Sequence, residues 1–192
     1  MARALLAPDG ASPHEIEFAF NPYGKPDVVA PTGAIRPFNI AHTEGLVVFT
    51  CCQRGRIGVD VERLCRNTDV ALARRYFAAP EVDYVMSQPS DDDQRLAFLR
   101  VWTLKESFIK AIGKGLSIPL ADFAFEEIDS TSPKVRILDP ALDDGCEWNF
   151  ACVTPAAGYI ASVALSDGAK RQMLEVQIRD FHSLLPPQPD EA

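Results

Sequence analysis

The segment 58–62, with the sequence GVDVE, constrains the fold of this chain more than any other. Its apolar and charged residues alternate, so a strand here turns Val59 and Val61 toward a core and projects Asp60 and Glu62 side by side from its opposite face. Such a pattern is usually a strand with one buried and one solvated face. Two neighbouring carboxylates also fit a metal site, and the segment alone leaves both interpretations open.

A second pattern predicts a long helix that ends at Gly113. Apolar residues recur at helical spacing between 94 and 112, and glycine commonly follows the last turn of a helix. Trp102, Glu106 and Lys110 are four residues apart and therefore lie on one face of this helix. A glutamate and a lysine at this spacing usually decorate a surface. If the helix instead crosses the strand, three carboxylates meet one lysine.

The chemistry of that combination points to a hard cation and a phosphate. Carboxylate oxygens with open coordination positions suit Mg²⁺, which keeps several waters and takes substrate phosphate oxygens as its other ligands. A lysine beside them neutralises a further phosphate oxygen. The two patterns together therefore predict a magnesium site for a pyrophosphate.

Both patterns resemble the signatures of the 4′-phosphopantetheinyl transferases of the surfactin-synthetase type, a Gly-Val/Ile-Asp-x-Glu strand and a Trp-x-x-Lys-Glu-Ser/Ala-x-x-Lys helix. The similarity continues through 23–26, 38–43 and 113–120, in the order typical of the family. It implies an α+β fold of two similar lobes, with antiparallel sheets and packed helices in a pseudo-twofold arrangement and a shortened first lobe. The expected parts are a first lobe over 1–53 with the nucleotide contacts, a second lobe over 54–183 with the metal site and long helix, and a disordered tail over 184–192.

Enzymes of this family transfer the phosphopantetheine arm of coenzyme A to a serine of an apo acyl or peptidyl carrier protein and release 3′,5′-ADP. The resemblance implies the same Mg²⁺-dependent reaction for this chain. It also implies roles for individual residues: Asp60, Glu62 and Glu106 as metal ligands, Lys110 on the pyrophosphate, Lys25 and His42 at the nucleotide end of coenzyme A, and Glu81 as the general base for the carrier serine.

Some of these assignments have alternatives. Glu81 also fits a residue at a helix N-terminus, in which case Glu62 or a metal-bound water would be the base, and His42 also fits a core or turn histidine. Where the family often has serine this chain has Ala41, so a backbone amide or the hydroxyl of Thr43 would take over that contact. The first lobe is short, so either the start of the protein lies upstream or the chain is a compact variant.

The composition is that of a soluble globular protein with room for a sizeable core, since 47% of the 192 residues are hydrophobic and 24% are charged. The formal net charge of −8 argues against nucleic-acid binding, which needs accumulated Lys and Arg. Arginines nevertheless gather around and after the 58–62 segment, either to meet an acidic carrier helix or as scattered surface charges. They are Arg54, Arg56, Arg63, Arg66, Arg74 and Arg75.

Cysteine usage and hydropathy predict a cytoplasmic protein. The five cysteines are odd in number and show no Cys-x-x-Cys or zinc-finger spacing, which favours reduced thiols. Residues 1–7 are too short for the core of a signal peptide, and no later apolar stretch approaches the length of a bilayer. We expect a monomer that contacts neither membrane nor nucleic acid.

Shorter signals outline the remaining elements. Thr68 or Asp69 fits the N-cap of a helix over 70–77. The segment 80–81 fits the start of another helix, and the acidic segment 91–93 fits the start of the long one, because negative charge suits a helix N-terminus. Early strands are predicted over 16–20, 46–52 and 57–61, and the strand over 46–52 is expected to be buried. A second antiparallel layer is predicted from strands over 123–125, 134–138, 148–153 and 159–165. The segment 176–181 is predicted to be a last strand or an extension.

Two other classes of function remain. A non-catalytic module would bind coenzyme A or a carrier protein without transfer, but it would not need the full set of three carboxylates and a lysine. Another Mg²⁺-dependent nucleotide enzyme would use the Gly-Lys-Gly at 113–115 as a phosphate loop, although the Lys-Ser/Thr end of such a loop is missing.

Overall fold

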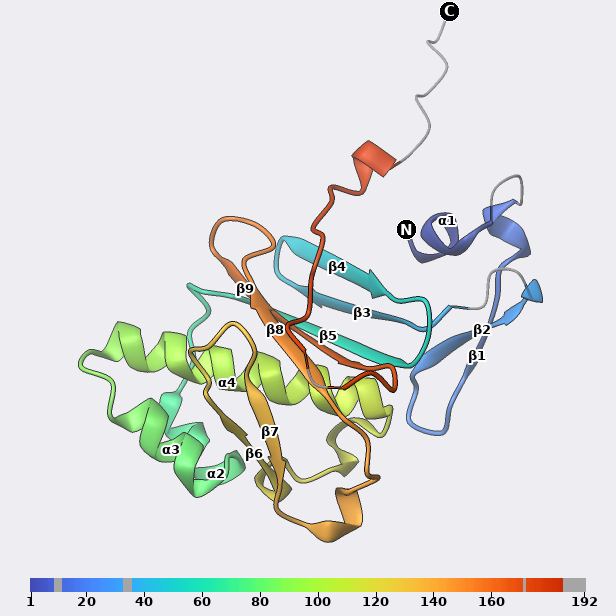
Figure 1. Ribbon diagram of the computed structural model, residues 1–192. Helices are drawn as coiled ribbons and strands as arrows, with labels where there is room; N and C mark the ends of the chain where they lie inside the picture. Colours follow the sequence, from blue (N-terminus) through green and yellow to red (C-terminus); the bar gives the residue numbers. More distant parts are fainter. Residues whose placement is uncertain (9–11, 33–35, 171, 185–192) are drawn as a thin grey trace, which may run out of the picture.

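The computed structural model describes residues 1–8, 12–32, 36–170 and 172–184, and Figure 1 shows how their elements are arranged. The helices are α1 (Ala2–Leu6), α2 (Ala73–Tyr76), α3 (Ala79–Met86) and α4 (Asp91–Ile112), with short 3₁₀ helices between them such as η5 (Leu120–Asp122). The strands are β1 (Glu17–Phe20), β2 (Pro26–Ala30), β3 (Phe38–Thr43), β4 (Leu46–Cys51), β5 (Arg56–Arg63), β6 (Phe123–Glu126), β7 (Lys134–Ile137), β8 (Asn149–Val153) and β9 (Tyr159–Ser166).

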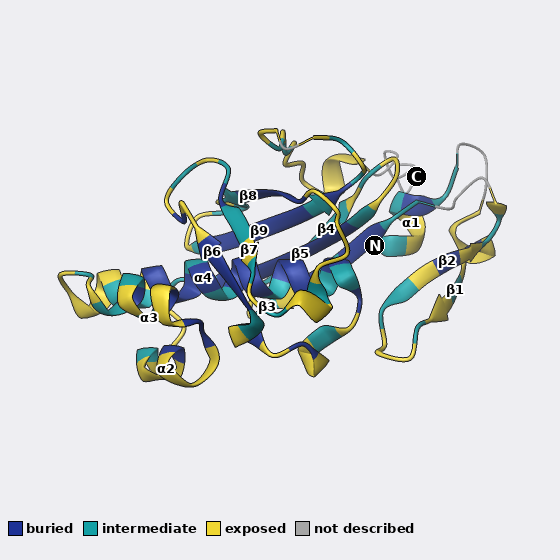
Figure 2. Cartoon of the chain, turned by 60° about the horizontal axis from the view of Figure 1, so that its bottom comes forward, coloured by how far each residue is buried: buried dark blue, intermediate teal, exposed yellow. Residues whose placement is uncertain are grey.

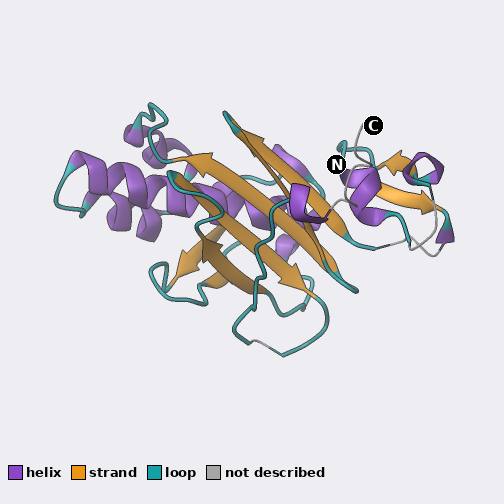
Figure 3. Ribbon diagram, turned by 90° about the horizontal axis from the view of Figure 1, so that it is seen from above, coloured by secondary structure: helices purple, strands orange, loops and turns teal. Residues whose placement is uncertain are grey.

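A three-stranded antiparallel sheet, in the order β5-β9-β8, forms the centre, and α4 lies across one of its faces (Figure 1 and Figure 3). Gly58 allows the helix and β5 to approach closely. A Cβ atom at this position would lie 2.1 Å from the carbonyl oxygen of Ser107 and 2.5 Å from the amide nitrogen of Ala111. A larger residue would push the helix off the strand, so the glycine of the first signature lets the two signatures touch.

The long helix begins and ends where its sequence predicts. The hydroxyl of Ser90 accepts a hydrogen bond from the Asp93 amide at 3.1 Å, and aspartates fill the first turn. Gly113 follows the last turn with a φ of +84°, in the left-handed region that glycine adopts without steric cost. These local signals fix both ends of the helix that carries Glu106 and Lys110.

The face of β5 that carries Val59 and Val61 packs against the β3–β4 hairpin and against a C-terminal segment that contains Leu174 and Val176. The Asn39 side chain joins β3 to β5 because it accepts a hydrogen bond from the Val59 amide at 2.9 Å. Both faces of β5 are therefore covered, as Figure 2 shows. The alternative of a solvated carboxylate face is wrong, because α4 covers that face.

The mixture of helices and antiparallel sheets confirms the α+β class. Among the described residues, some strands differ from expectation. β4 is only partly buried, because it lies at the edge of a two-stranded sheet with β3. β6 and β7 pair with each other while β8 and β9 join β5, so they form no common second layer. The segment 176–181 is not a strand: Val176 packs against the core of the sheet, and residues 177–180 are exposed.

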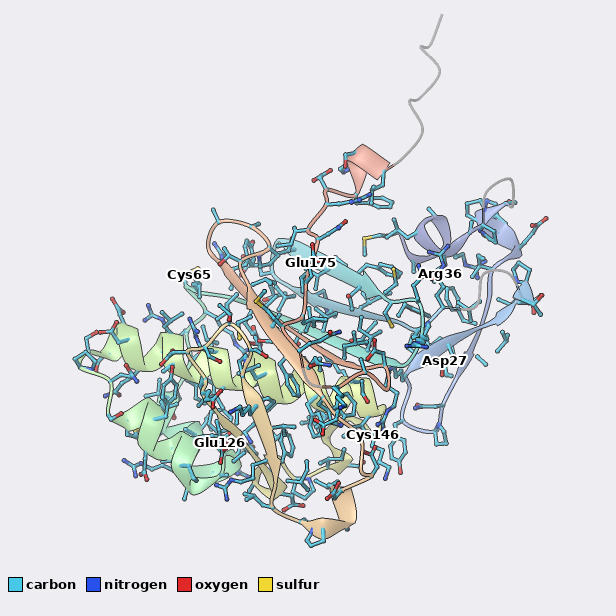
Figure 4. All side chains as sticks on the ribbon, in the orientation of Figure 1. Asp27, Arg36, Cys65, Glu126, Cys146 and Glu175 are labelled. Atoms are coloured by element: carbon cyan, nitrogen blue, oxygen red, sulfur yellow. The ribbon has the colours of Figure 1, made fainter. Side chains whose placement is uncertain are left out.

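The expected lobe boundary near Gln53 falls in the turn between β4 and β5, and the division into lobes stays a prediction. Leu184 closes a 3₁₀ helix (His182–Leu184), and the rest of the expected tail, 185–192, lies outside the described residues. In the described part of the chain, no helix has the length and apolar character needed to cross a bilayer. All five cysteines are free thiols, and Figure 4 shows Cys65 and Cys146 at well-separated places.

Candidate functional site

The carboxylates and the lysine of the two signatures come together where β5 crosses α4. Asp60 and Glu62 are 7% and 8% exposed on the strand face that the helix covers. Glu106 and Lys110 project from the helix, and the Lys110 ammonium donates a hydrogen bond to Asp60 Oδ1 at 2.6 Å. The crossing that the sequence predicted is therefore present, and the roles of these four residues stay predictions.

Burial and mutual repulsion make these carboxylates hard to ionise. Burial raises the pKa of Asp60 from 3.8 to about 7; the Lys110 ammonium opposes the rise, and Glu106 and Glu62 add to it. Burial also raises the pKa of Glu106, again opposed by Lys110 and assisted by Glu62. An added cation would favour the charged form of both carboxylates. The site therefore lacks positive charge.

Two carboxylate oxygens in the site, Asp60 Oδ2 and Glu106 Oε1, are buried and have no hydrogen-bond partner among the described residues. An unsatisfied buried polar group costs about 1–3 kcal/mol, and more when it is charged. Mg²⁺ is commonly held by one or two carboxylates, with waters and phosphate oxygens as its other ligands. The residues present therefore fit a divalent cation of this kind.

Side-chain cations hold other carboxylate oxygens of the site. Arg66 forms an ion pair with Glu62, as Lys110 does with Asp60. Within the described ranges, no three His, Cys, Asp or Glu side chains form a ready-made metal cage. A metal would therefore use Asp60 and Glu106 first, and Glu62 would join only after it has released Arg66.

The raised pKa of Asp60 predicts a measurable pH dependence of stability in the metal-free protein. The unfolded chain loses this proton near pH 3.8 and the folded chain near pH 7, so the folded state binds more protons between these values and loses stability as the pH rises through them. The difference between these two pKa values corresponds to a decrease in the free energy of unfolding of about 4 kcal/mol at most. We expect Asp60→Asn to flatten this decrease, measured by urea unfolding in the presence of a chelator at about pH 4, 5.5 and 8. An equally steep decrease in both proteins would contradict the assignment, since Glu106 is the same in both.

Glu81 occupies a different environment from the one expected of a general base. It lies in the first turn of α3, is completely buried, and forms an ion pair with the equally buried Lys105 at 2.7 Å. Its two oxygens also accept hydrogen bonds from the amides of Ala78, at 3.1 Å, and Phe125, at 2.8 Å. Because both oxygens are used and no surface is exposed, the carboxylate does not face an incoming serine. The environment favours the alternative of a structural residue at a helix N-terminus, and the role of Glu81 as general base stays a prediction.

The two residues expected at the nucleotide end of coenzyme A, Lys25 and His42, differ in how accessible their side chains are to a ligand. Lys25 lies on the loop between β1 and β2, as predicted, but its ammonium points inward and donates to the carbonyl oxygens of Ile57, Lys110 and Ala111. His42 is exposed on β3, which packs beside β5. The structure thus leaves His42 accessible to a ligand and excludes the alternative of a core histidine, whereas Lys25 is engaged by the protein itself.

Sequence reasoning missed two polar residues that join distant segments through their side chains. Lys105 lies one helical turn from Val101 and one from Ile109, both of them completely buried, so its position in a buried stripe was visible in the spacing. The side chain of Asn21 donates to the carbonyl oxygen of Gly113 at 2.7 Å. No local pattern could reveal this contact, because the two residues are 92 positions apart.

The part of the chain that contains both signatures matches a known family. Residues 56–164 match the sequence model of the 4′-phosphopantetheinyl transferase superfamily. The chain is 30% identical over 162 residues to the 4′-phosphopantetheinyl transferase HetI of Nostoc sp., an alignment that covers 82% of this chain and 63% of HetI.

Two further relatives are also similar to this chain over part of their length. The 4′-phosphopantetheinyl transferase gsp of Aneurinibacillus migulanus is 38% identical over 151 residues, which cover 72% of this chain and 61% of gsp. Sfp of Bacillus subtilis strain 168, also a 4′-phosphopantetheinyl transferase, is 36% identical over 110 residues, which cover 57% of this chain and 47% of Sfp. The matches span between about half and just under two thirds of the length of these relatives. The matched region contains β5 and α4, the elements that carry the site residues, and the chain belongs to the 4′-phosphopantetheinyl transferase superfamily.

Proposed function

We propose that this chain transfers the 4′-phosphopantetheine arm of coenzyme A to a serine of an apo acyl or peptidyl carrier protein and releases 3′,5′-ADP. The observation that carries the proposal is the pair of orphaned, buried carboxylate oxygens on Asp60 and Glu106, beside Lys110, in a chain of this superfamily. The names of the relatives support the same reaction. The metal we propose is Mg²⁺, and the monomeric state and cytoplasmic location expected from the sequence stay predictions.

In the proposed reaction, a bond forms between the serine oxygen and the β-phosphorus of coenzyme A, and the bond from that phosphorus to the oxygen of 3′,5′-ADP breaks. Mg²⁺, when bound, supplies charge stabilisation for the pyrophosphate. Asp60 and Glu106 would hold the cation. The Lys110 side chain, which is 28% exposed, can leave Asp60 and pair with a phosphate oxygen. Stabilisation of developing charge is usually the largest single contribution to catalysis.

The proton of the serine needs an acceptor close to the pyrophosphate. General-base assistance is typically worth about 10²–10⁴-fold in rate, provided that the base reaches the proton it removes. The Glu81 carboxylate is enclosed by Lys105 and two backbone amides, so it would reach this proton only if that arrangement opened. The acceptors that this geometry leaves are Glu62, on the same strand face as Asp60, and water.

Five of the six arginines identified in the sequence divide into two groups, and the sixth, Arg54, is exposed between β4 and β5. Arg56, Arg63 and Arg66 each pair with an acidic side chain of this chain. Arg74 and Arg75 are exposed on α2, one of the helices that follow the Asp60 strand. An acidic surface of a carrier protein is attracted by exposed cations of this kind. We therefore propose that α2 contributes to the docking of the carrier protein.

A module that binds coenzyme A or a carrier protein without transfer is the alternative function. Such a module needs cations for the phosphates, but it gains nothing from buried carboxylates with unsatisfied oxygens, which disfavour a phosphate unless a metal lies between them. The two functions differ in their product, because only the transferase changes the mass of a carrier protein.

The direct test is the intact mass of a panel of apo carrier proteins incubated with the chain, coenzyme A and Mg²⁺. We expect at least one carrier to gain the mass of phosphopantetheine, and to gain none when a chelator replaces Mg²⁺ or when alanine replaces the acceptor serine. If a folded chain that binds coenzyme A, as measured by calorimetry, modifies no carrier in a diverse panel, the binding-module alternative is the better description.

A further inference from the structure

We propose that Lys25 is a positioning residue that locks β5 against the C-terminal end of α4 and thereby holds Lys110 in register with Asp60, instead of contacting the nucleotide. The structural part of this inference concerns the protein alone, and only its kinetic consequence rests on the proposed function.

The ammonium of Lys25 is saturated by backbone carbonyls. It donates to the carbonyl oxygen of Ile57 at 3.1 Å, of Lys110 at 2.8 Å and of Ala111 at 3.2 Å. A lysine ammonium has three donors and no acceptor, so no donor is left for a phosphate. Burial lowers the pKa of Lys25, with Asp27 opposing.

The carbonyl groups that accept hydrogen bonds from Lys25 belong to both elements of the site, β5 and α4. Ile57 lies on β5 on the same strand as Asp60, and its side chain belongs to the core on the far face. Lys110 and Ala111 form the last turn of α4, where the carbonyl groups have no partner within the helix. A cation at this end also interacts favourably with the helix dipole. One side chain therefore bridges the strand that carries Asp60 and the turn that carries Lys110.

Asn21 anchors the same loop to the helix by a second bond. Its amide nitrogen donates to the Gly113 carbonyl oxygen at 2.7 Å, and its side-chain oxygen accepts from the amides of Tyr23 and Lys25, each at 2.9 Å. A Cβ atom on Gly113 would lie 3.2 Å from the Lys25 side chain, so the loop and the helix end are in contact. We call the loop 21–25 with these bonds the clasp.

The clasp acts on the site through the backbone of Lys110. The carbonyl of this residue is held by Lys25, and its ammonium is held by Asp60. When the clasp is lost, the last turn of α4 has unpaired carbonyls and opens more often, because local openings are the least costly where few bonds hold the backbone. The Lys110 ammonium then spends less time beside Asp60, although Gly58 still sets the crossing of strand and helix.

The protein alone tests the clasp by amide hydrogen exchange. The Gly113 amide, which donates to the Ile109 carbonyl at 2.9 Å, and its neighbours in the last turn report on opening of this end of the helix. We expect Lys25→Met to speed their exchange by about tenfold or more, and Asn21→Ala to speed it in the same place to a smaller extent. Lys114→Met removes an exposed lysine beside the same turn and should leave the exchange unchanged.

The kinetic test separates a clasp from a nucleotide contact. The kinetic assay contains an apo carrier, coenzyme A and Mg²⁺. If Lys25 acts through the clasp, Lys25→Met should lower kcat by about tenfold, while KM for coenzyme A changes little. In a chain that already carries Lys110→Met, adding Lys25→Met should lower kcat little further. The expected kcat change follows from displacement of a charge-stabilising group. A nucleotide contact predicts the reverse, a higher KM for coenzyme A with unchanged kcat and unchanged exchange at 110–113, and this result would overturn the proposal.

The two tests also separate this inference from the proposed function. If no carrier is modified by the unaltered chain, the transferase proposal fails, while hydrogen exchange still decides whether the clasp exists. If Lys25→Met does not fold, Asn21→Ala carries both tests, because Asn21 holds the same loop without a charge. Unchanged exchange at the end of α4 in Asn21→Ala would then overturn the clasp.

Discussion

Asp60→Asn is expected to lower the maximal rate of phosphopantetheine transfer by about 10²-fold or more even at saturating Mg²⁺, and Glu106→Gln to act similarly. Each substitution removes the charge from one of the two carboxylates that carry an orphaned oxygen. The cation then binds more weakly and the pyrophosphate loses the charge that stabilises it. We therefore expect a higher Mg²⁺ concentration at half-maximal rate together with a lower maximal rate. The measurement is the initial rate with an apo carrier over a Mg²⁺ titration.

Two further variants make the result specific. Asp83→Asn neutralises an exposed aspartate on α3, remote from β5 in sequence, and should change neither quantity. Lys110→Met removes the cation that competes with the metal for Asp60, so we expect a lower rate but no greater need for Mg²⁺. If Asp60→Asn keeps the Mg²⁺ dependence and the turnover of the unaltered chain, the metal site does not lie where we place it.

The sequence predicted the two signature segments well because their signals are local. Strand alternation around Asp60, an acidic first turn for α4, and Gly113 after its last turn are each contained in a few neighbouring residues. The crossing of the two segments followed from chemistry, since three carboxylates and a lysine have a common purpose only when they meet. The resemblance to a family with this arrangement supplied the roles.

The sequence could not predict the surroundings of these residues, because they depend on contacts between distant segments. The alternation within β5 predicted a core against Val59 and Val61, but it could not indicate that a C-terminal segment with Leu174 and Val176 forms part of that core. The resemblance implied a nucleotide contact for Lys25, whereas its partners in the structure are carbonyls of the strand and helix that it touches. Glu81 matched a motif position, but its burial depends on β6 and on Lys105.

The pair of Glu81 and Lys105 yields the largest expected effect on stability. The ammonium of Lys105 also donates to the carbonyl oxygens of Leu120 and Phe123, each at 2.7 Å, and lies 4.2 Å from the centre of the Phe123 ring. The pair thus joins α3, α4, η5 and β6 in the interior. Removal of one partner leaves an uncompensated buried charge, so we expect Lys105→Met to lower the free energy of unfolding by about 3–5 kcal/mol. Urea unfolding at neutral pH measures this change.

A double-mutant cycle shows whether the loss comes from the pair. We expect Glu81→Gln alone to cost a comparable amount, because it leaves the Lys105 charge buried without its anion, and the double variant to cost clearly less than the sum, because it buries no unpaired charge. Arg136→Met breaks the exposed ion pair with Glu126 and should cost about 1 kcal/mol or less.

The Glu81→Gln variant also decides the role of Glu81 in the reaction. If Glu81→Gln unfolds like the unaltered chain but turns over more slowly at saturating carrier, with an altered dependence on pH, then Glu81 acts as the base and the buried arrangement opens during the reaction.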